Sequence, residues 1–208
     1  MAVATFPLGP LETNSYLLHT AAQAVAVDVG GDPAPMLDYL REHKLALAAI
    51  CITHRHFDHL YGVADLAKAT DAPVYVPQGD DALAQTESSQ GGLWGFPPVP
   101  PFVSQPMPEG TAAFGGMDCQ ILNTPGHTPG GVSLYFPTEG VVFTGDALFY
   151  RSIGRTDFPG GDHETLLHSV RDVLFKLPDA TRVFPGHGPA TSIGDEKLNN
   201  PFCGEFPS

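Results

Sequence analysis

The spacing of apolar positions along the chain alternates between a strand-like and a helix-like pattern. Short apolar runs that contain β-branched residues and stop at glycine, proline or polar residues predict strands. These runs cover residues 15–19, 24–28, 46–53, 73–77, 117–123, 132–136, 140–144 and 181–184. We therefore expect several short strands.

Apolar residues three and four positions apart predict helices between these strands. The clearest helix covers residues 162–177, in which Leu166, Val170 and Leu177 lie on one face. Further helices are predicted at residues 33–44, 60–70, 80–86 and 193–198. This order of elements predicts an α/β fold with two sheets covered by helices, four layers in all, although a doubly wound sheet would satisfy the same order.

One long segment, residues 87–108, follows neither pattern. It is rich in glycine, proline and aromatic residues, among them Trp94, Phe96 and Phe102. A segment of this length is unusual as a simple connection between elements. Two interpretations stay open: a substrate lid that carries Trp94 and Phe96, or an insertion packed on the body of the protein.

Composition and charge narrow the class of protein. The chain has 208 residues, of which 42% are hydrophobic, enough for a substantial core in a single domain spanning residues 1–208. Its formal net charge is −13, with 10 lysines and arginines against 23 acidic residues. Proteins that bind nucleic acids use a basic surface to neutralise phosphates, so nucleic acid is not an expected partner.

Neither the N-terminus nor the cysteines indicate export. Residues 1–7 lack a basic segment followed by an apolar one, so no signal peptide is expected. No run approaches the ~18 apolar residues of a membrane span. The three cysteines, Cys51, Cys119 and Cys203, are scattered and odd in number, which indicates buried free thiols rather than a disulfide framework. We expect a cytoplasmic protein without a membrane partner.

The candidate chemistry begins in the segment Thr53-His-Arg-His-Phe-Asp-His59. Four potential metal ligands follow one another directly after a predicted strand: His54, His56, Asp58 and His59. Side chains two apart on an extended backbone point the same way, so His54 and His56 can serve one ion. Asp58 and His59 can diverge to serve a second ion where the chain turns into a helix.

Three more residues of the same kind follow, each next to glycine and just beyond a predicted strand. They are His127, Asp146 and His187. Glycine lets the backbone approach a ligand closely and adopts positive φ without strain. Seven ligands are too many for one tetrahedral ion and suit two ions that share a bridging carboxylate. Imidazole and carboxylate without thiolate suit zinc, and also iron or manganese.

The order of these motifs resembles that of the metallo-β-lactamase superfamily. The signature of the superfamily is a T-H-x-H-x-D-H loop followed by separate His, Asp and His motifs, which correspond here to residues 53–59, His127, Asp146 and His187. Within the superfamily the chain is similar to the glyoxalase II (hydroxyacylglutathione hydrolase) group, in its short bacterial form without the C-terminal helical domain. The resemblance extends from residues 8–16 to residues 200–202 and implies a four-layer αβ/βα sandwich.

The resemblance also implies a role for each residue. The ligands implied for the first metal are His54, His56 and His127. Those implied for the second metal are Asp58, His59 and His187, with Asp146 bridging the two. Two divalent ions lower the pKa of a bound water from 15.7 toward ~7 and polarise a carbonyl. The implied activity is hydrolysis of a small-molecule thioester of the S-lactoylglutathione type by a metal-bound hydroxide, with Asp58 and Asp146 as catalytic residues.

The remaining cations and histidines are weaker candidates. Arg151 and Arg155 could attract an anionic group of a substrate. Alternatively, Arg155 forms a structural ion pair with Asp157, the interpretation we favour. The other four histidines have no ligand-like context and are interpreted as surface or helix residues: His19, His43, His163 and His168.

Other functions on the same fold stay open. A lactone presents the same carbonyl to attack, so a lactone hydrolase fits. A persulfide dioxygenase holds one iron with two His and one Asp, and residues 154–158 resemble a segment of that group. Its last motif has Asp after the His, whereas Gly188 follows His187 here, which favours the two-metal hydrolase. A β-lactamase would need export, and an electron-transfer protein would carry a fused flavin domain, so we expect neither.

Overall fold

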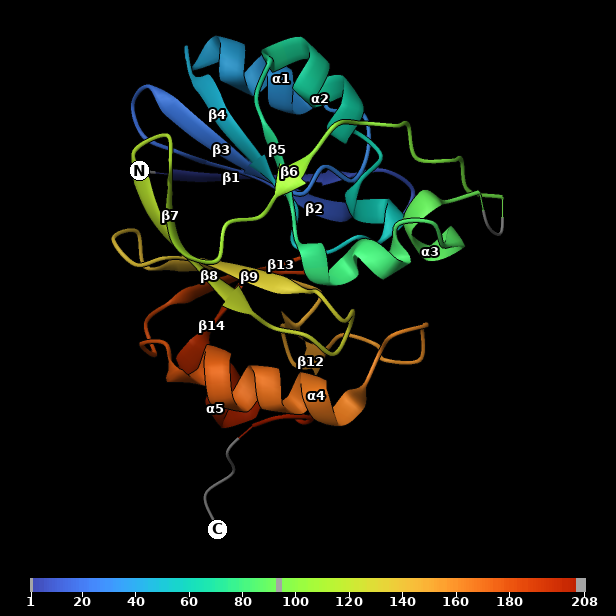
Figure 1. Ribbon diagram of the computed structural model, residues 1–208. Coiled ribbons are helices and arrows are strands. Elements are labelled where there is room, and N and C mark those ends of the chain that lie inside the picture. The colour runs from blue at the N-terminus through green and yellow to red at the C-terminus, as the bar shows by residue number, and fades with distance from the viewer. Residues whose placement is uncertain (1, 93–94, 205–208) are drawn as a thin grey trace.

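The computed structural model describes residues 2–92 and 95–204, and its two sheets lie between two layers of helices (Figure 1). The predicted four-layer α/β arrangement is therefore confirmed, and the alternative of one doubly wound sheet is wrong. Trp94, named above as part of a lid or an insertion, lies outside the described residues.

The N-terminal sheet has six strands in sequence order. Its first three strands pair antiparallel, and the third to the sixth pair parallel. The strands are β1 (Ala2–Leu8), β2 (Thr13–His19), β3 (Gln23–Val27), β4 (Ala46–Cys51), β5 (Val74–Val76) and β6 (Gln105–Pro106). The sequence pattern missed β1, an edge strand that contains Pro7. An edge position tolerates proline because the missing N–H need not pair there.

The C-terminal sheet also has six strands, in the order β14-β13-β10-β9-β8-β7. Only β10 and β13 pair parallel. The strands are β7 (Gly110–Phe114), β8 (Met117–Asn123), β9 (Val132–Phe136), β10 (Val141–Gly145), β13 (Arg182–Pro185) and β14 (Thr191–Ser192). A separate small ribbon joins β11 (Leu148–Phe149) to β12 (Ser152–Ile153).

The helices cover the outer faces of the two sheets. Figure 1 shows α1 and α2 above the N-terminal sheet and α4 and α5 below the C-terminal sheet. The α-helices are α1 (Ala34–Glu42), α2 (Val63–Thr70), α3 (Glu87–Gln90), α4 (His163–His168) and α5 (Ile193–Asn199). Short helical turns are η1 (Phe57–His59), η2 (Gln78–Leu83), η3 (Ser169–Val173) and η4 (Leu174–Lys176). The predicted helix at residues 162–177 is thus a continuous helical segment with a π turn in its middle.

The cores follow the two-residue period of the strands. Val141 and Phe143 on β10 pack between the sheets, whereas Val142 faces the helices of the C-terminal layer. On β2, Leu18 packs between the sheets and Leu17 faces the helices of the N-terminal layer. Three buried clusters therefore lock four layers together, and the loops at the strand ends are left free to carry polar residues.

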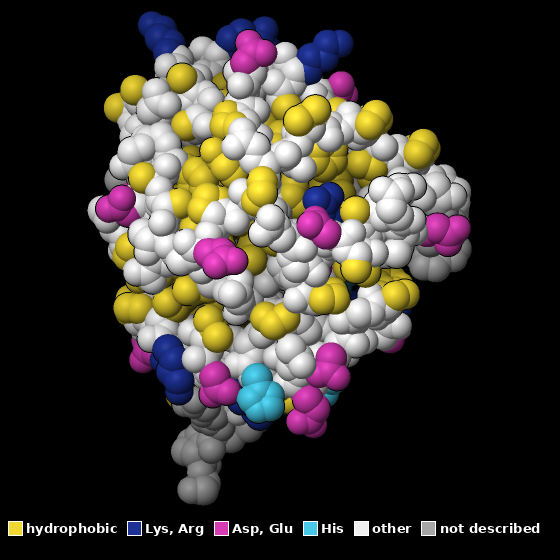
Figure 2. Space-filling view, viewed as in Figure 1, with side chains coloured by type: hydrophobic (Ala, Val, Ile, Leu, Met, Phe, Trp, Pro, Cys, Tyr) yellow, Lys and Arg dark blue, Asp and Glu magenta, His cyan; other side chains and the backbone are white. Residues whose placement is uncertain are grey.

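The surface charge and the helices were compared with the expectation that neither nucleic acid nor a membrane is a partner. On the face shown in Figure 2, Lys and Arg side chains are scattered, with several at the edge over α1 and α2, and form no continuous patch there. Among the described residues, none of the helices has both the length and the apolar character needed to cross a bilayer.

Candidate metal centre

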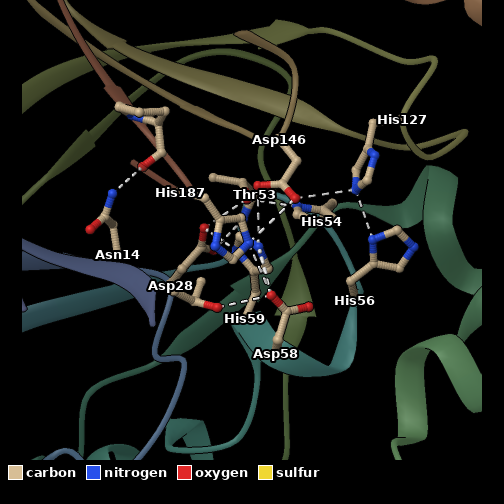
Figure 3. Close-up of polar contacts among 12 residues, drawn as sticks. Asn14, Asp28, Thr53, His54, His56, Asp58, His59, His127, Asp146 and His187 are labelled. Atoms are coloured by element: carbon tan, nitrogen blue, oxygen red, sulfur yellow. Dashed lines mark hydrogen bonds and ion pairs between the residues drawn. The ribbon is translucent and has the colours of Figure 1, made fainter. Parts of the chain in front are cut away.

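Seven polar side chains from four loops converge at one edge of the sandwich (Figure 3). The loops follow β4, β8, β10 and β13, so each leaves the carboxyl end of a strand. They carry the seven residues that the sequence singled out: His54, His56, Asp58, His59, His127, Asp146 and His187. Residues on loops anchored by a rigid scaffold are well placed for chemistry. The structure thus brings together every predicted ligand.

The first group of potential ligands consists of His54, His56 and His127. Their ligand atoms all lie within 4.8 Å of one another. Nδ1 of His56 and Nε2 of His127 are 2.8 Å apart. This is the set that the sequence motifs implied for the first metal.

The second group consists of Asp58, His59 and His187, which also lie within 4.8 Å of one another. Nε2 of His187 is 3.2 Å from Oδ2 of Asp58, and Nε2 of His59 is 3.6 Å from the same oxygen. This is the set implied for the second metal.

Asp146 lies between the two groups. Its Oδ1 is 3.4 Å from Nε2 of His59, and its Oδ2 is 3.4 Å from Nε2 of His127. The same Oδ2 is 3.7 Å from Nε2 of His187. One carboxylate therefore faces both groups, as a bridging ligand must.

The unpaired atoms of the cluster test whether metal ions fit. Nε2 of three histidines and Oδ1 of Asp146 are buried without a hydrogen-bond partner among the described residues; the histidines are His54, His56 and His59. Buried polar atoms are rarely left unpaired, so such a group calls for a partner such as an ion. Nitrogens bound to one tetrahedral ion at 2.0–2.1 Å lie about 3.3 Å apart, close to the separations found here. The residues fit a pair of divalent ions.

Asp28 fixes the orientation of two imidazoles. Its carboxylate accepts hydrogen bonds from the backbone N–H and hydroxyl of Thr53, both at 2.8 Å, and lies 2.8 Å from Nδ1 of His59. The Thr53 oxygen in turn lies 3.0 Å from Nδ1 of His54. Because Nδ1 of each ring donates to these oxygens, Nε2 of His54 and of His59 is left to face the centre.

His127 is oriented by backbone. Its Nδ1 lies 2.7 Å from the carbonyl oxygen of Arg155. A carbonyl only accepts hydrogen bonds, so Nδ1 carries the proton and Nε2 is free for an ion. The loop after β12 therefore supports a ligand on the loop after β8.

Asp80 joins the loops that carry the first group. This fully buried carboxylate accepts hydrogen bonds from the backbone N–H of Arg55 at 3.0 Å, the hydroxyl of Thr128 at 3.0 Å and the backbone N–H of Gly130 at 2.6 Å. Arg55 lies between two ligands, and Thr128 directly follows the third. Asp28 and Asp80 lie outside the ligand motifs, so no role was predicted for either.

Strand β2 supports the second group. The hydroxyl of Thr13 donates to Oδ2 of Asp58 at 2.9 Å. The amide of Asn14 donates to the carbonyls of Pro185 at 3.1 Å and Gly188 at 2.8 Å, on either side of His187. These supports come from a strand far from the ligands in the sequence, and no spacing along the chain indicates them.

The electrostatics of the first group favour neutral imidazoles. Burial and the neighbouring His59 and His56 lower the pKa of His54 well below its usual value. Burial and the neighbouring His127 lower the pKa of His56 to about 3. Both rings are therefore neutral at pH 7, the form in which histidine binds metals.

The second group favours ionised carboxylates. Burial by itself would raise the pKa of Asp58, but His59 and a hydrogen bond to His187 hold it below its usual value. Burial likewise opposes the shift at Asp146, whose pKa His59 and His127 lower. Burial would lower the pKa of His59, yet Asp58 and other carboxylates raise it well above its usual value. The carboxylates stay ionised, and in the metal-free protein His59 serves as their cation.

Glycine is required where the ligand loops approach each other. A Cβ atom at Gly186 would lie 2.1 Å from Oδ1 of Asp146, and one at Gly145 would lie 2.4 Å from the Thr53 oxygen. Gly145 also has a φ of 49°. A side chain at either position would push ligands apart, as the sequence analysis expected of the glycines in these motifs.

The two arginines are engaged in ion pairs. Arg155 forms a bidentate pair with Asp157, with both hydrogen bonds at 2.7 Å, which confirms the favoured interpretation. Arg151 contacts Glu196 at 2.7 Å and Asp195 at 2.9 Å on α5. Four histidines lie outside the cluster of seven candidate ligands: His19, His43, His163 and His168. All four are exposed except His19 on β2, which is half-buried. The three cysteines are buried and free, as predicted.

A pocket opens over the ligands. It has a volume of about 700 Å³ and is lined by ligands of both groups and by the phenyl rings of Phe57, Phe96, Phe149 and Phe158. This size is typical of small-molecule sites. Within residues 87–108, Phe102 packs against the core of the N-terminal layer, as predicted for an insertion, whereas Phe96 lines the pocket. A lid function of this segment stays a prediction.

Comparisons with known proteins agree with this geometry. The family model described as the metallo-beta-lactamase superfamily matches residues 8–187. The chain is 37% identical to "Probable metallo-hydrolase YqgX" of Bacillus subtilis, covering 96% of each chain. It is 33% identical to "Hydroxyacylglutathione hydrolase GloC" of Haemophilus influenzae, covering 97% of this chain and 98% of that protein. The chain belongs to the metallo-β-lactamase superfamily.

Solved structures show the same fold. TTHA1623, solved in a di-iron-bound form, is 42% identical with a TM-score of 0.86, over 96% of this chain and 99% of that one. The B3 metallo-beta-lactamase BLEG-1 is 37% identical with a TM-score of 0.89, over 97% and 99%. ETHE1 from Myxococcus xanthus is 33% identical with a TM-score of 0.79, over 98% and 84%. Family and ligand cluster together support a metal-dependent hydrolase that uses divalent ions.

Proposed function

We propose that the chain is a thioester hydrolase of the hydroxyacylglutathione type, with two divalent ions held by the seven-residue cluster. The observation that carries this proposal is a cluster in which buried atoms of His54, His59 and Asp146 have no hydrogen-bond partner among the described residues. Five members of the same cluster line a ligand-sized pocket: His56, Asp58, His127, Asp146 and His187. The likeness to the hydroxyacylglutathione hydrolase of Haemophilus influenzae over nearly the full length of both chains supports the choice of thioesters.

The metal ions would supply two effects in this site: a lower pKa for a bound water, toward ~7, and polarisation of the carbonyl oxygen. In the proposal, each group of three ligands would hold one zinc or iron ion, with Asp146 shared between the groups. The di-iron form of TTHA1623 makes iron a concrete alternative to zinc.

The protein's own groups position the reacting atoms. Asp58 and Asp146 are ionised at neutral pH because nearby histidines lower the pKa of each carboxyl. In the proposal they act as catalytic residues, accepting hydrogen bonds from the attacking water and directing a lone pair at the carbonyl carbon. Asp28 and Asp80 keep the imidazoles in place during the reaction.

A persulfide dioxygenase is the second candidate, because ETHE1 from Myxococcus xanthus shares the fold at 33% identity. The complete second group of ligands, Asp58, His59 and His187, favours the hydrolase, since a single iron does not need it. A lactone hydrolase would use the same site and the same attack on a carbonyl.

The decisive assay compares two substrates of the purified protein. With S-D-lactoylglutathione, we expect thiol release that stops after chelation and returns with added metal. His127→Ala should reduce the rate at least ~100-fold, while the exposed His163→Ala should leave it unchanged. Oxygen uptake on glutathione persulfide without thiol release from the thioester would instead establish the dioxygenase.

A further inference from the structure

The walls of the pocket are more apolar than the reaction itself requires. Five of its lining residues present apolar surface around the ligands: Leu11, Phe57, Phe96, Phe149 and Phe158. They come from different segments of the chain, so the apolar character is not a by-product of one hydrophobic segment. Phe57 and Phe96 contact each other with ring centroids 5.3 Å apart and form one wall.

Two of the rings lie directly beside the ligands, one at each group. Phe158 packs edge-on against His56 with centroids 5.6 Å apart. Phe149 lies in the same manner beside His187, at 6.2 Å. An acyl group held over the cluster therefore meets a phenyl ring whichever group of ligands it faces.

Charged recognition is weak in the same pocket. Apart from the ligands, the charged side chains among the described lining residues are those of Glu87 and Arg155. The guanidinium of Arg155 is occupied by the carboxylate of Asp157 and also lies 4.1 Å from the centroid of the Phe158 ring. A charged acyl group would find little compensation for its lost hydration there.

We infer that the pocket selects thioesters whose acyl group carries a large apolar substituent, above all an aromatic ring, over the small lactoyl group. The inference rests on the proposed thioester hydrolysis. A lactoyl group offers one methyl to a cavity of about 700 Å³ lined by four phenyl rings. A phenyl group in the same place buries more apolar surface and stacks against these rings.

The test compares two substrates that differ only at that position. S-D-lactoylglutathione and S-D-mandeloylglutathione share the glutathione leaving group, the thioester carbonyl and the hydroxyl. The second has a phenyl group in place of the methyl group. A single methylene that fits an apolar pocket changes kcat/KM by about 10–200-fold. We therefore expect kcat/KM to be at least about tenfold higher for the mandeloyl thioester. Equal values, or a preference for lactoyl, would overturn the inference.

Variants of the walls locate the preference. Phe96→Ala and Phe149→Ala should each reduce the mandeloyl preference about 3–10-fold, mainly by raising KM for that substrate. Phe202, which is 53% exposed and does not line the pocket, supplies the matched control. A preference that survives both wall variants, or that falls equally in Phe202→Ala, would contradict the assignment.

A binding measurement separates this inference from the proposed function. Calorimetry with the metal-loaded protein compares D-mandelate with D-lactate, the acids that the two thioesters would release. Tighter binding of mandelate, by about tenfold, supports the apolar pocket even if neither thioester is cleaved, in which case only the proposed function fails. Equal binding of the two acids overturns the inference even if both thioesters are cleaved.

Discussion

Asp80 shows how one residue outside the ligand motifs shapes the centre. Its two oxygens accept hydrogen bonds from the backbone N–H groups of Arg55 and Gly130 and from the hydroxyl of Thr128, and so hold the loops on both sides of the first group. Partners of this kind fix ligand geometry, and their loss typically costs 10–100-fold in metal affinity.

Asp80→Asn should therefore weaken the first group selectively. An amide has one acceptor oxygen, so at least one of the three hydrogen bonds is lost. We expect the metal content after dialysis against a weak chelator to fall from about two to about one ion per chain. The neighbouring Asp81, whose side chain is 64% exposed, provides the control Asp81→Asn. Full metal content in Asp80→Asn would contradict the positioning role.

The low pKa of His56 predicts acid sensitivity of the metal-free protein. In the unfolded chain a histidine titrates near 6.5, whereas burial and His127 lower the pKa of His56 to about 3 in the folded state. The unfolded state therefore takes up protons first, and the free energy of unfolding decreases as pH falls from 7 to 5, on the order of 2 kcal/mol for this residue. The raised pKa of His59 acts in the opposite sense, because its stabilisation becomes complete only below about pH 6.5, whereas the lowered pKa of His54 adds to the loss.

Urea unfolding of metal-free protein at pH 7 and pH 5 measures this effect. His56→Gln removes the titrating group and should flatten the dependence. A metal-free protein that is as stable at pH 5 as at pH 7 would show that the ring is protonated in the folded state.

Among the elements, strand β2 supports the second group from Thr13 to Tyr16. Besides the amide of Asn14, the hydroxyl of Tyr16 donates to the carbonyl of Pro185 at 2.6 Å. The backbone N–H of Asn14 donates to the carbonyl of Gly186 at 2.8 Å. The strand thus holds the turn that presents His187.

Asn14→Ala should loosen that turn. It removes the side-chain donor of the Gly188 carbonyl and leaves the Pro185 carbonyl with the Tyr16 hydroxyl alone. We expect thioester hydrolysis to fall at least about tenfold with loss of the ion in the second group. Asn199→Ala, an exposed asparagine on α5, is the matched control. Unchanged activity and metal content in Asn14→Ala would mean that the backbone alone holds the turn.

The elements also show what the sequence pattern could and could not predict. Buried strands such as β9 and β10 are mostly apolar and were predicted within a residue or so. The edge strand β1 was missed because its exposed residues break the pattern. The π turn of η3 leaves Leu166, Val170 and Leu174 buried on one face, so the apolar spacing still indicated a helix and could not indicate the turn.

At the scale of the molecule, the ligands could be predicted and their surroundings could not. Four candidate ligands lie together in residues 53–59, the other three each lie beside glycine, and the order of these motifs was sufficient to predict all seven. The four phenyl rings of the pocket lie on separate segments of the chain and follow no regular spacing along the sequence: Phe57, Phe96, Phe149 and Phe158. Only the folded arrangement of four layers brings them together.

Metal removal should destabilise the whole fold, because the ions bind the folded state alone. Binding at a free concentration 100-fold above Kd stabilises by about 2.7 kcal/mol, and chelation should lower Tm by about 5–10 °C in a protein of this size. Calorimetric scans with and without chelator measure this decrease in Tm. The His163→Ala variant should show the same decrease as the unmodified protein, and His127→Ala a smaller one. An unchanged Tm after chelation would argue against a resident metal.

The central claim, that four loops hold two ions side by side, is tested most directly by anomalous X-ray diffraction from crystals of the metal-loaded protein. We expect two anomalous peaks on either side of Asp146, one within reach of His54, His56 and His127 and the other within reach of Asp58, His59 and His187. A single peak in fully loaded, active protein would contradict it.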